Sequence, residues 1–519
     1  MKIKVLHHAA EQQKKDAVSA ENGVSRIQRN LDPALHPFAR EREYQRAMVG
    51  VKLQKLFAKP FVTALDGHFD AIRVLRRSNA APMRLYSGAC DGEVILWDLG
   101  FSKVQTRWKA HTGFVRGIVE EPGISTSNSL FTCGDDKCIH WWDLSSLGTS
   151  ALQDEDQYAA SKTNSGYANS SKGNVMQLGG PSGAGASSST IGGGATTGSS
   201  SSCDSTSITP RHTWRAASAI TSLDHHWSKP LLVSTGDTVD LWDRNRSQPI
   251  SSIEWGCDQV YVAKFNPAEP CLIAATAADN SISLYDLRQT TQNSAIRKVL
   301  LKNRSNALCW NPQEPQYFTV ANENGNLYTF DMRKLSNAVT VHAGHVMPVL
   351  DVDYAPNGQE FVSASYDRTV RLWSLRAQGS YTNSGQQARD TYHGKRMQRV
   401  LACQFSTDGR FVFSGSEDHN VRVWKSRAAE KLGGVSSDRE AKARYYRERL
   451  VEKYSATREV SRIAKQSHLP KTIRTMAAKQ KIMKDAKKRK DQNRKAHSKP
   501  GTTFENTFEK QKMLRHEEA

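Results

Sequence analysis

The feature that most constrains this chain is a short segment that recurs along it, an alternating apolar stretch that ends in an aromatic residue, usually followed by Asp. The copies are VILWDL, IHWWDL, VDLWDR, ISLYDL, LYTFDM, VRLWSL and VRVWKS, with aromatic residues Trp97, Trp142, Trp242, Tyr285, Phe330, Trp373 and Trp424. Successive aromatics lie 45, 100, 43, 45, 43 and 51 residues apart. All but one spacing is near the roughly 40–45-residue period of a four-stranded propeller blade. The sequence therefore predicts an all-β fold, a seven-bladed β-propeller over residues 61–425.

The one long spacing contains an insertion, which we place at residues 146–209. It includes the tract GGPSGAGASSSTIGGGATTGSSSS. Such a Gly/Ser tract cannot bury enough apolar surface to offset the entropy of ordering it. We therefore expect a disordered loop within the propeller, located at a blade junction between the second and third repeats, where it need not disturb the core.

The best-preserved repeats also carry a His, a Ser or Thr and an Asp ahead of the aromatic residue. The sets are His68, Ser87, Asp91 and Trp97; His111, Thr132, Asp136 and Trp142; His345, Ser363, Asp367 and Trp373; and, in the seventh repeat, Ser414, Asp418 and Trp424 with Lys395 in place of His. Buried indole, hydroxyl and imidazole groups need partners, and one chain of hydrogen bonds within a blade can serve them all. Repeats three to five have lost most of this set, with Ala275 and Val320 at hydroxyl positions. We expect those blades to depend more on apolar packing.

Asp, His and Ser are also the residues of a hydrolase triad, but here the set recurs once per repeat, so a structural role explains it better. The sequence has no G-x-x-x-x-G-K-[ST] loop, H-E-x-x-H pair or nucleophile elbow. Cys133 and Cys138 lack the spacing of a zinc knuckle. We therefore predict a protein that is not an enzyme and has no cofactor and no structural metal.

Two segments flank the repeats. The seventh repeat ends at its third strand, and residues 61–65 (FVTAL) are expected to supply the fourth, which would close the ring and remove free sheet edges. In the amino-terminal arm, residues 1–60, a helical stripe of Tyr44, Met48, Val51 and Lys55 ends before Pro60. That helix is either packed on the propeller rim or a docking arm for a partner.

The net charge of +20 is concentrated at the two ends of the chain. Residues 1–60 carry 12 basic and 6 acidic side chains and residues 425–519 carry 27 and 12, whereas the repeats are nearly neutral. The extension, residues 426–519, is expected to form three helices, the first capped by Ser437 and the third running from Pro470 to Pro500. Apolar residues such as Ile473, Met476 and Met483 occupy only the first half of the third helix, which is therefore expected to dock at its start.

The third helix is the candidate site for binding RNA. Residues 471–499 contain 12 Lys or Arg and 2 Asp. A solvated charge run is the usual explanation for such a segment, but helical spacing gathers these cations so that several phosphates could be contacted together, with release of counterions. The candidate contact residues are Lys481, Lys484, Lys487, Lys488, Arg489, Lys490, Arg494 and Lys495. Few aromatics interleave them, which favours contact with the backbone of folded RNA over base stacking. Residues 484–490 are also typical of a nuclear-import signal.

The arm RNLDPALHPFAREREYQRAM, the seven repeats, and a tail containing REAKARYY, HLPKTI and KKRKDQNRKAHSKPG together resemble the WD-repeat and Sof-domain-containing protein family. The resemblance covers nearly the whole chain except the Gly/Ser insertion. It implies a nuclear and nucleolar component of the small-subunit processome, which scaffolds pre-rRNA, a small nucleolar RNP and other processome proteins for 18S rRNA maturation. No run approaches the roughly 18 apolar residues of a membrane span, so no membrane partner is expected.

The same resemblance implies an alternative function, because some family members are described as substrate receptors of a cullin-RING ubiquitin ligase. Such propellers bind the ligase adaptor through an aromatic-Asp-x-Arg pattern after the third strand. Two consecutive repeats match it, Tyr285-Asp286-Leu287-Arg288 and Phe330-Asp331-Met332-Arg333. Arg288 and Arg333 could instead pair with acidic groups on the propeller surface, and both interpretations stay open.

Overall fold

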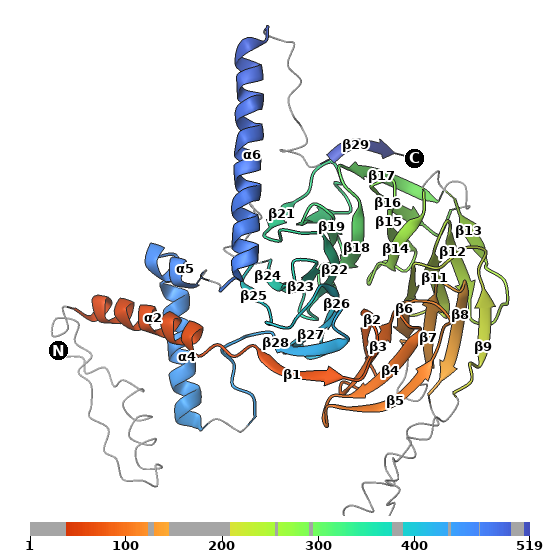
Figure 1. Ribbon diagram of the computed structural model, residues 1–519, viewed down its shortest axis with the longest axis horizontal. Helices are drawn as coiled ribbons and strands as arrows, with labels where there is room; N and C mark the ends of the chain where they lie inside the picture. Colours follow the sequence, from red (N-terminus) through yellow and green to blue (C-terminus); the bar gives the residue numbers. More distant parts are fainter. Residues whose placement is uncertain are drawn as a thin grey trace, which may run out of the picture. The chain divides into compact units, whose positions relative to one another are not determined.

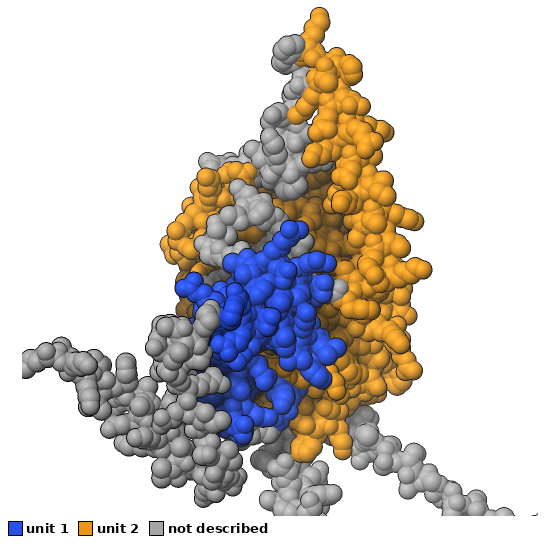
Figure 2. Space-filling model, turned by 90° about the vertical axis from the view of Figure 1, so that its left-hand side faces the viewer, with its two compact units in different colours: residues 1–58, 431–466 blue, residues 59–430, 467–519 orange. Residues whose placement is uncertain are grey.

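The computed structural model describes residues 38–122, 129–144, 208–254, 258–289, 294–375, 388–433, 437–464, 466, 468–499 and 513–518. The chain forms two compact units, shown in different colours in Figure 2. One comprises residues 1–58 and 431–466, and the other residues 59–430 and 467–519. The predicted disordered insertion lies outside the described residues except for its last two positions.

The larger unit contains seven antiparallel sheets, which confirms the predicted propeller (Figure 1). The first three blades consist of β2 (Ile72–Arg77), β3 (Arg84–Ala89), β4 (Glu93–Asp98) and β5 (Lys103–Lys109); of β6 (Val115–Glu120), β7 (Ser129–Gly134), β8 (Cys138–Asp143) and β9 (His212–Arg215); and of β10 (Ser222–His225), β11 (Leu231–Thr235), β12 (Val239–Asp243) and β13 (Ser251–Ile253). The fourth and fifth blades consist of β14 (Val260–Phe265), β15 (Leu272–Ala277), β16 (Ser281–Asp286) and β17 (Ala295–Leu301), and of β18 (Ser305–Trp310), β19 (Tyr317–Asn322), β20 (Asn326–Asp331) and β21 (Thr340–Ala343). The sixth blade consists of β22 (Val349–Tyr354), β23 (Glu360–Ser365), β24 (Val370–Ser374) and β25 (Asp390–Tyr392), and the seventh of β26 (Val400–Phe405), β27 (Phe411–Ser416) and β28 (Asn420–Lys425) with β1 (Phe61–Asp66). A further strand, β29 (Met513–Glu518), pairs with β17 at the edge of the fourth blade.

The first strand of each blade contacts the first strand of the next, and β26 contacts β2, so these strands close a ring. Each blade is therefore covered on both faces, and most residues of its third strand are buried. In β4, for example, the four residues from Val94 to Trp97 are all buried. One apolar cluster joins Leu85, Ile95 and Trp97 of the first blade to Phe413 and Val421 of the last, so apolar burial between blades stabilises the ring.

The ring closes as the sequence predicted. Strand β1 pairs antiparallel with β28, with Leu65 opposite Val421. Leu65 is buried, and the ring of Phe61 contacts that of Trp424 with centroids 5.5 Å apart. The residues that precede the first repeat thus complete the last blade and pair with β28, which would otherwise be its edge strand.

The predicted position of the insertion relative to the blades was wrong. Strand β9 follows the insertion and pairs with β8, with Trp214 opposite Ile139. The insertion therefore joins the third and fourth strands of the second blade and does not lie at a blade junction. The reason is that the recurring aromatic segment ends at the third strand, so the fourth strand of a blade comes after it in the chain.

The smaller unit contains the helices α2 (Ala39–Leu56), α4 (Asp438–Lys453) and α5 (Arg458–Ala464). The Ser437 side chain caps α4 by accepting from the Glu440 backbone N–H at 3.4 Å. Glu43 of α2 pairs with Lys453 at 2.7 Å, and the Tyr44 hydroxyl donates to Glu459 at 2.8 Å. The helix of the arm thus packs on the extension, an arrangement that neither interpretation of the arm included.

Helix α6 (Lys471–His497) is the third predicted helix of the extension and belongs to the same unit as the propeller. Ile473 is buried, and Gln480 Nε2 donates to the Val346 carbonyl at 2.7 Å. Met476 and Met483 are 42% and 71% exposed, so the apolar contact is shorter than the sequence suggested. Among the described helices, none has the length and apolar character needed to cross a bilayer.

Candidate functional site

The recurring His, Ser or Thr, Asp and Trp side chains form complete hydrogen-bonded chains in the second and sixth blades. In the sixth, His345 Nδ1 lies 2.8 Å from Asp367 Oδ2, His345 Nε2 lies 2.7 Å from Ser363 Oγ, and Trp373 Nε1 donates to the same Oγ at 2.8 Å. The second blade repeats this arrangement with His111, Thr132, Asp136 and Trp142. Each chain satisfies polar groups inside a blade and leaves no open position for a substrate.

Two other blades depart from the sequence pattern. In the first, His68 Nε2 and Trp97 Nε1 both reach Ser87 Oγ, at 2.6 and 2.7 Å. Asp91, however, accepts from the Glu93 backbone N–H, and His68 Nδ1 has no hydrogen-bond partner in the described part of the chain.

In the seventh blade, Trp424 donates to Ser414 at 2.8 Å. The exposed Lys395 does not replace the missing His. Arg422 of β28 pairs with Asp418 instead. The Asp418 carboxylate is therefore paired with an arginine of the same blade, which the sequence pattern did not indicate.

The prediction that repeats three to five depend more on apolar packing was wrong for the fifth blade, whereas the third keeps one hydrogen bond of the set. Trp242 of the third blade donates to Ser234 at 2.8 Å. The fifth blade has its own buried chain, in which Thr329 Oγ1 lies 2.8 Å from Thr319 Oγ1 and 3.0 Å from His342 Nε2. Thr319 stands one residue before Val320, and successive strand residues point to opposite faces. The hydrogen-bonded chain therefore lies on the face of that blade opposite to the one that the repeat pattern predicted.

His342 makes the stability of the propeller sensitive to acid. Burial lowers the pKa of His342 from 6.5 to about 3, so the unfolded chain binds a proton below pH 6.5 that the folded chain does not. The resulting stability is fully present above pH 6.5 and declines as the pH falls toward 3. From pH 7 to pH 5 this residue alone is expected to reduce the free energy of unfolding by about 2 kcal/mol. Urea unfolding of the His342→Asn variant should show a correspondingly smaller decrease, and an unchanged decrease would contradict the assignment.

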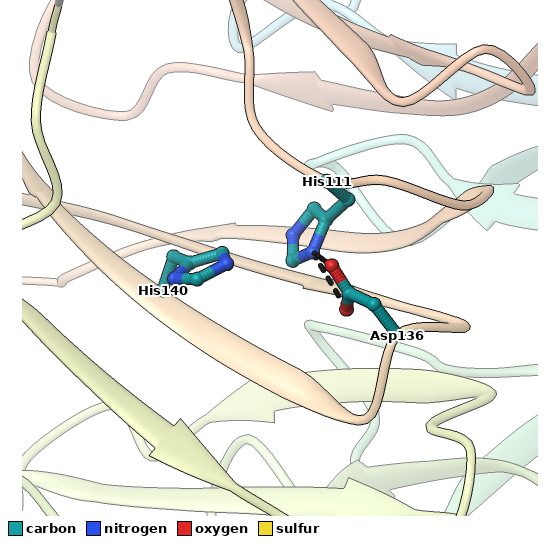
Figure 3. Close-up of side chains that lie close together, drawn as sticks. All are labelled: His111, Asp136 and His140. Carbon is teal, nitrogen blue, oxygen red and sulfur yellow. Dashed lines mark hydrogen bonds and ion pairs between the residues drawn. The ribbon is translucent and has the colours of Figure 1, made fainter.

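His111, Asp136 and His140 lie close together and are the metal-type cluster among the described residues (Figure 3). Their candidate ligand atoms lie within 4.8 Å of one another. However, His111 uses Nδ1 toward Asp136 and Nε2 toward Thr132, so neither ring nitrogen is available. His140 Nδ1 lies 2.9 Å from Thr213 Oγ1. At most two donors remain, fewer than a structural zinc site needs, and the cluster is better explained as part of the blade's hydrogen bonding.

The structure places every predicted RNA-contact residue on one helix. All eight side chains are exposed, and none forms an ion pair with a carboxylate of the described residues. They are Lys481, Lys484, Lys487, Lys488, Arg489, Lys490, Arg494 and Lys495 of α6. Because intramolecular partners do not neutralise these cations, they are available to an external polyanion.

Arg288 and Arg333 occupy equivalent positions in the turns after β16 and β20. Each backbone N–H donates to the Asp two residues before it, at 3.0 Å. The Arg333 guanidinium donates to the Gln316 amide, and the pKa of Arg288 is raised by its hydrogen bond to Cys271. Neither arginine forms an ion pair within 4.0 Å with a carboxylate of the described residues. The nearby Asp286 and Glu269 nevertheless add to the raised pKa of Arg288, so the explanation by acidic groups on the propeller surface stays open for that residue.

Comparison with known proteins gives matches over both parts of the chain. A model of the Sof1-like domain matches residues 426–514, and a model of the WD domain, G-beta repeat, matches residues 102–143, 336–374 and 387–425. "DDB1- and CUL4-associated factor 13" of Danio rerio is 39% identical over 502 residues, 97% of this chain and 96% of the relative. "Protein SOF1" of Saccharomyces cerevisiae is 33% identical over 507 residues, 95% of this chain and 91% of the relative. Among solved structures, the WD40 beta propeller domain of Doa1 has a TM-score of 0.49 at 17% identity, covering 71% of this chain and 98% of that chain.

Proposed function

Since this chain belongs to the WD-repeat family whose members carry a carboxyl-terminal Sof1-like domain, we propose that it is a non-enzymatic assembly factor of the small-subunit processome. In this role it scaffolds pre-rRNA, a small nucleolar RNP and other processome proteins in the nucleolus. The observation that carries the proposal is the set of eight exposed basic side chains on α6 without described carboxylate partners. They supply the sequence-independent contacts that hold a folded RNA.

The proposal is tested by ultraviolet crosslinking of the tagged protein in cells, followed by sequencing of the attached RNA. A deletion of residues 471–499, fused to a separate nuclear-import signal, is examined in parallel. We expect crosslinks to the small-subunit precursor or its small nucleolar RNA, and their loss on deletion. A protein that stays in the particle without RNA crosslinks would be held by protein contacts alone, which contradicts the assigned role of α6.

A second candidate function, that of a substrate receptor for a cullin-RING ligase, is favoured by Arg288 and Arg333. They occupy matching turns of neighbouring blades, and relatives are named for association with DDB1 and CUL4. Because the two guanidinium groups lack carboxylate partners among the described residues, an acidic adaptor surface would supply them.

We expect the double variant Arg288→Ala and Arg333→Ala to lose adaptor binding at least tenfold if the receptor function is correct, because arginines are common interface hot spots. Its RNA crosslinks should be unchanged. A suitable control is Arg246→Ala, since Arg246 is exposed and lies in the turn after the third strand of the third blade. Adaptor binding measured with purified proteins decides the question, and equal binding by wild type and double variant excludes a role for these arginines.

A further inference from the structure

A cavity of about 410 Å³ lies between the basic helix and the fifth blade. Lys484, Lys487 and Lys488 of α6 line one side, and Asn303 and Tyr328 line the other. The blade residues come from the turn before β18 and from the start of β20. Its volume lies in the range of sites for small ligands, and it combines cationic, amide and phenolic groups.

Tyr328 supplies a buried hydroxyl group whose proton has no acceptor among the described residues. Its side chain is 2% exposed, and its oxygen accepts from Asn324 Nδ2 at 2.6 Å. The Asn324 amide cannot be turned around, because its Oδ1 accepts from the Asn326 backbone N–H at 2.8 Å. The phenol is therefore an acceptor toward Asn324. Asn326 Nδ2 lies 3.4 Å from the same oxygen, too far for a strong hydrogen bond in either orientation of that amide, so the phenolic O–H has no strong acceptor among the described residues. A buried donor without a partner destabilises the protein, so this group indicates a ligand acceptor.

The remaining groups define the chemistry of that ligand. Three ammonium groups on one side favour a phosphate. The Asn303 side chain has no hydrogen bond to a described residue, and an amide can both donate to and accept from the edge of a base. Asp485 also lines the cavity and adds an acceptor. The mixture of cations for a phosphate with donors and acceptors for a base matches a nucleotide better than a bare anion.

We propose that this cavity binds one unstacked nucleotide of the RNA, with its phosphate on the α6 lysines and its base or ribose against Asn303 and Tyr328. The inference rests on the proposed function and deepens it, because it adds a contact that only an unpaired nucleotide can make. Unstacked nucleotides are the usual targets of specific RNA recognition, since a base in a duplex has its edges occupied. The cavity thus distinguishes single-stranded segments from duplexes, which the exposed cations alone do not.

The test measures binding of the full chain to two fluorescent RNAs of equal length, one single-stranded and one a perfectly paired duplex. Tyr328→Phe removes only the hydroxyl group, and Asn303→Ala removes an amide that is half-buried. Each variant is expected to bind the single strand about tenfold more weakly, or about 1.4 kcal/mol, and the duplex unchanged. Because no phosphate contact is removed, the salt dependence should stay that of the wild type. Tyr366→Phe, which removes a hydroxyl outside the cavity, is the matched control.

The possible failures are distinguishable. If Tyr328→Phe and Asn303→Ala bind both RNAs as the wild type does, the nucleotide site is wrong while the proposed function stands. An equal loss for both RNAs would also overturn the site, because it would indicate that the variants displace α6. If charge reversal on α6 weakens neither RNA, the RNA-binding function itself fails.

Discussion

Replacing Lys484, Lys487, Lys488 and Arg489 with Glu is expected to reduce RNA affinity about a thousandfold at physiological salt and to leave the propeller folded. All four side chains are exposed on α6, so the change removes no buried contact. Contacts between cations and phosphates are charge-assisted, and a loss of about 1 kcal/mol for each of the four gives about 4 kcal/mol. A factor of ten in affinity corresponds to about 1.4 kcal/mol.

The same variant should change the salt dependence of binding. Each phosphate contact contributes about 0.7 to the slope of log affinity against log salt for a single strand, so the slope should fall by about 3. The control is replacement of the exposed propeller residues Lys103, Lys109, Lys229 and Lys334 by Glu, which changes the net charge equally. Their effect should be small, because salt screens charges beyond about 10 Å. An equal loss in the control would mean that total charge, and not α6, determines binding.

The blades could be predicted because their signal is local and repeated. Every repeat places an aromatic residue at the end of a strand covered on both faces, and Trp97, Trp242 and Trp373 are all almost completely buried. A spacing of ten residues between Ser and Trp recurs in Ser87 and Trp97 and in Ser363 and Trp373. Such spacing follows from the fixed geometry of a hairpin, in which the two residues face the same side.

The chain of Thr319, Thr329 and His342 could not be predicted from the same pattern. It lies on the opposite face of the fifth blade and reaches the Tyr354 hydroxyl of the sixth blade at 2.5 Å. The repeat pattern requires Ser or Thr at position 320, which is Val320 in this repeat, so the pattern does not detect this chain of side chains. The signal that was present is the spacing of ten between the two threonines, displaced by one residue from the expected register.

Contacts between segments far apart in the chain could also not be predicted from the sequence. The stripe of Tyr44 and Val51 indicates which side of α2 is buried, but not what covers it. The partners of Glu43 and Tyr44 are Lys453 and Glu459, more than 400 residues away. Periodicity describes a single helix and carries no information on its neighbour. For the same reason, the eight cations of α6 were predictable, whereas the cavity that some of them share with Tyr328 required the fold.

Replacing Ser363 with Ala is expected to lower the free energy of unfolding by about 4 kcal/mol, roughly twice the effect of Ser414→Ala. Both side chains are fully buried. Since His345 donates from Nδ1 to Asp367, its Nε2 accepts from Ser363, which in turn accepts from Trp373. The first variant therefore leaves two buried groups without partners, and each costs about 1–3 kcal/mol. Among the described residues, Ser414 bonds only to the Trp424 indole.

Urea unfolding at pH 7 measures the difference between these two variants directly. The added variant Ser363→Ala with Trp373→Phe removes both ends of one hydrogen bond. If the hydrogen-bonded side chains contribute as described, the double variant should lose less free energy of unfolding than the sum of the losses for Ser363→Ala and Trp373→Phe. The reason is that the double variant has no unpaired indole N–H. Equal losses for Ser363→Ala and Ser414→Ala would mean that the His345 bond adds nothing measurable. The repeated His would then reflect the packing of its ring, which contacts Trp373 with centroids 6.3 Å apart, and not the satisfaction of buried polar groups.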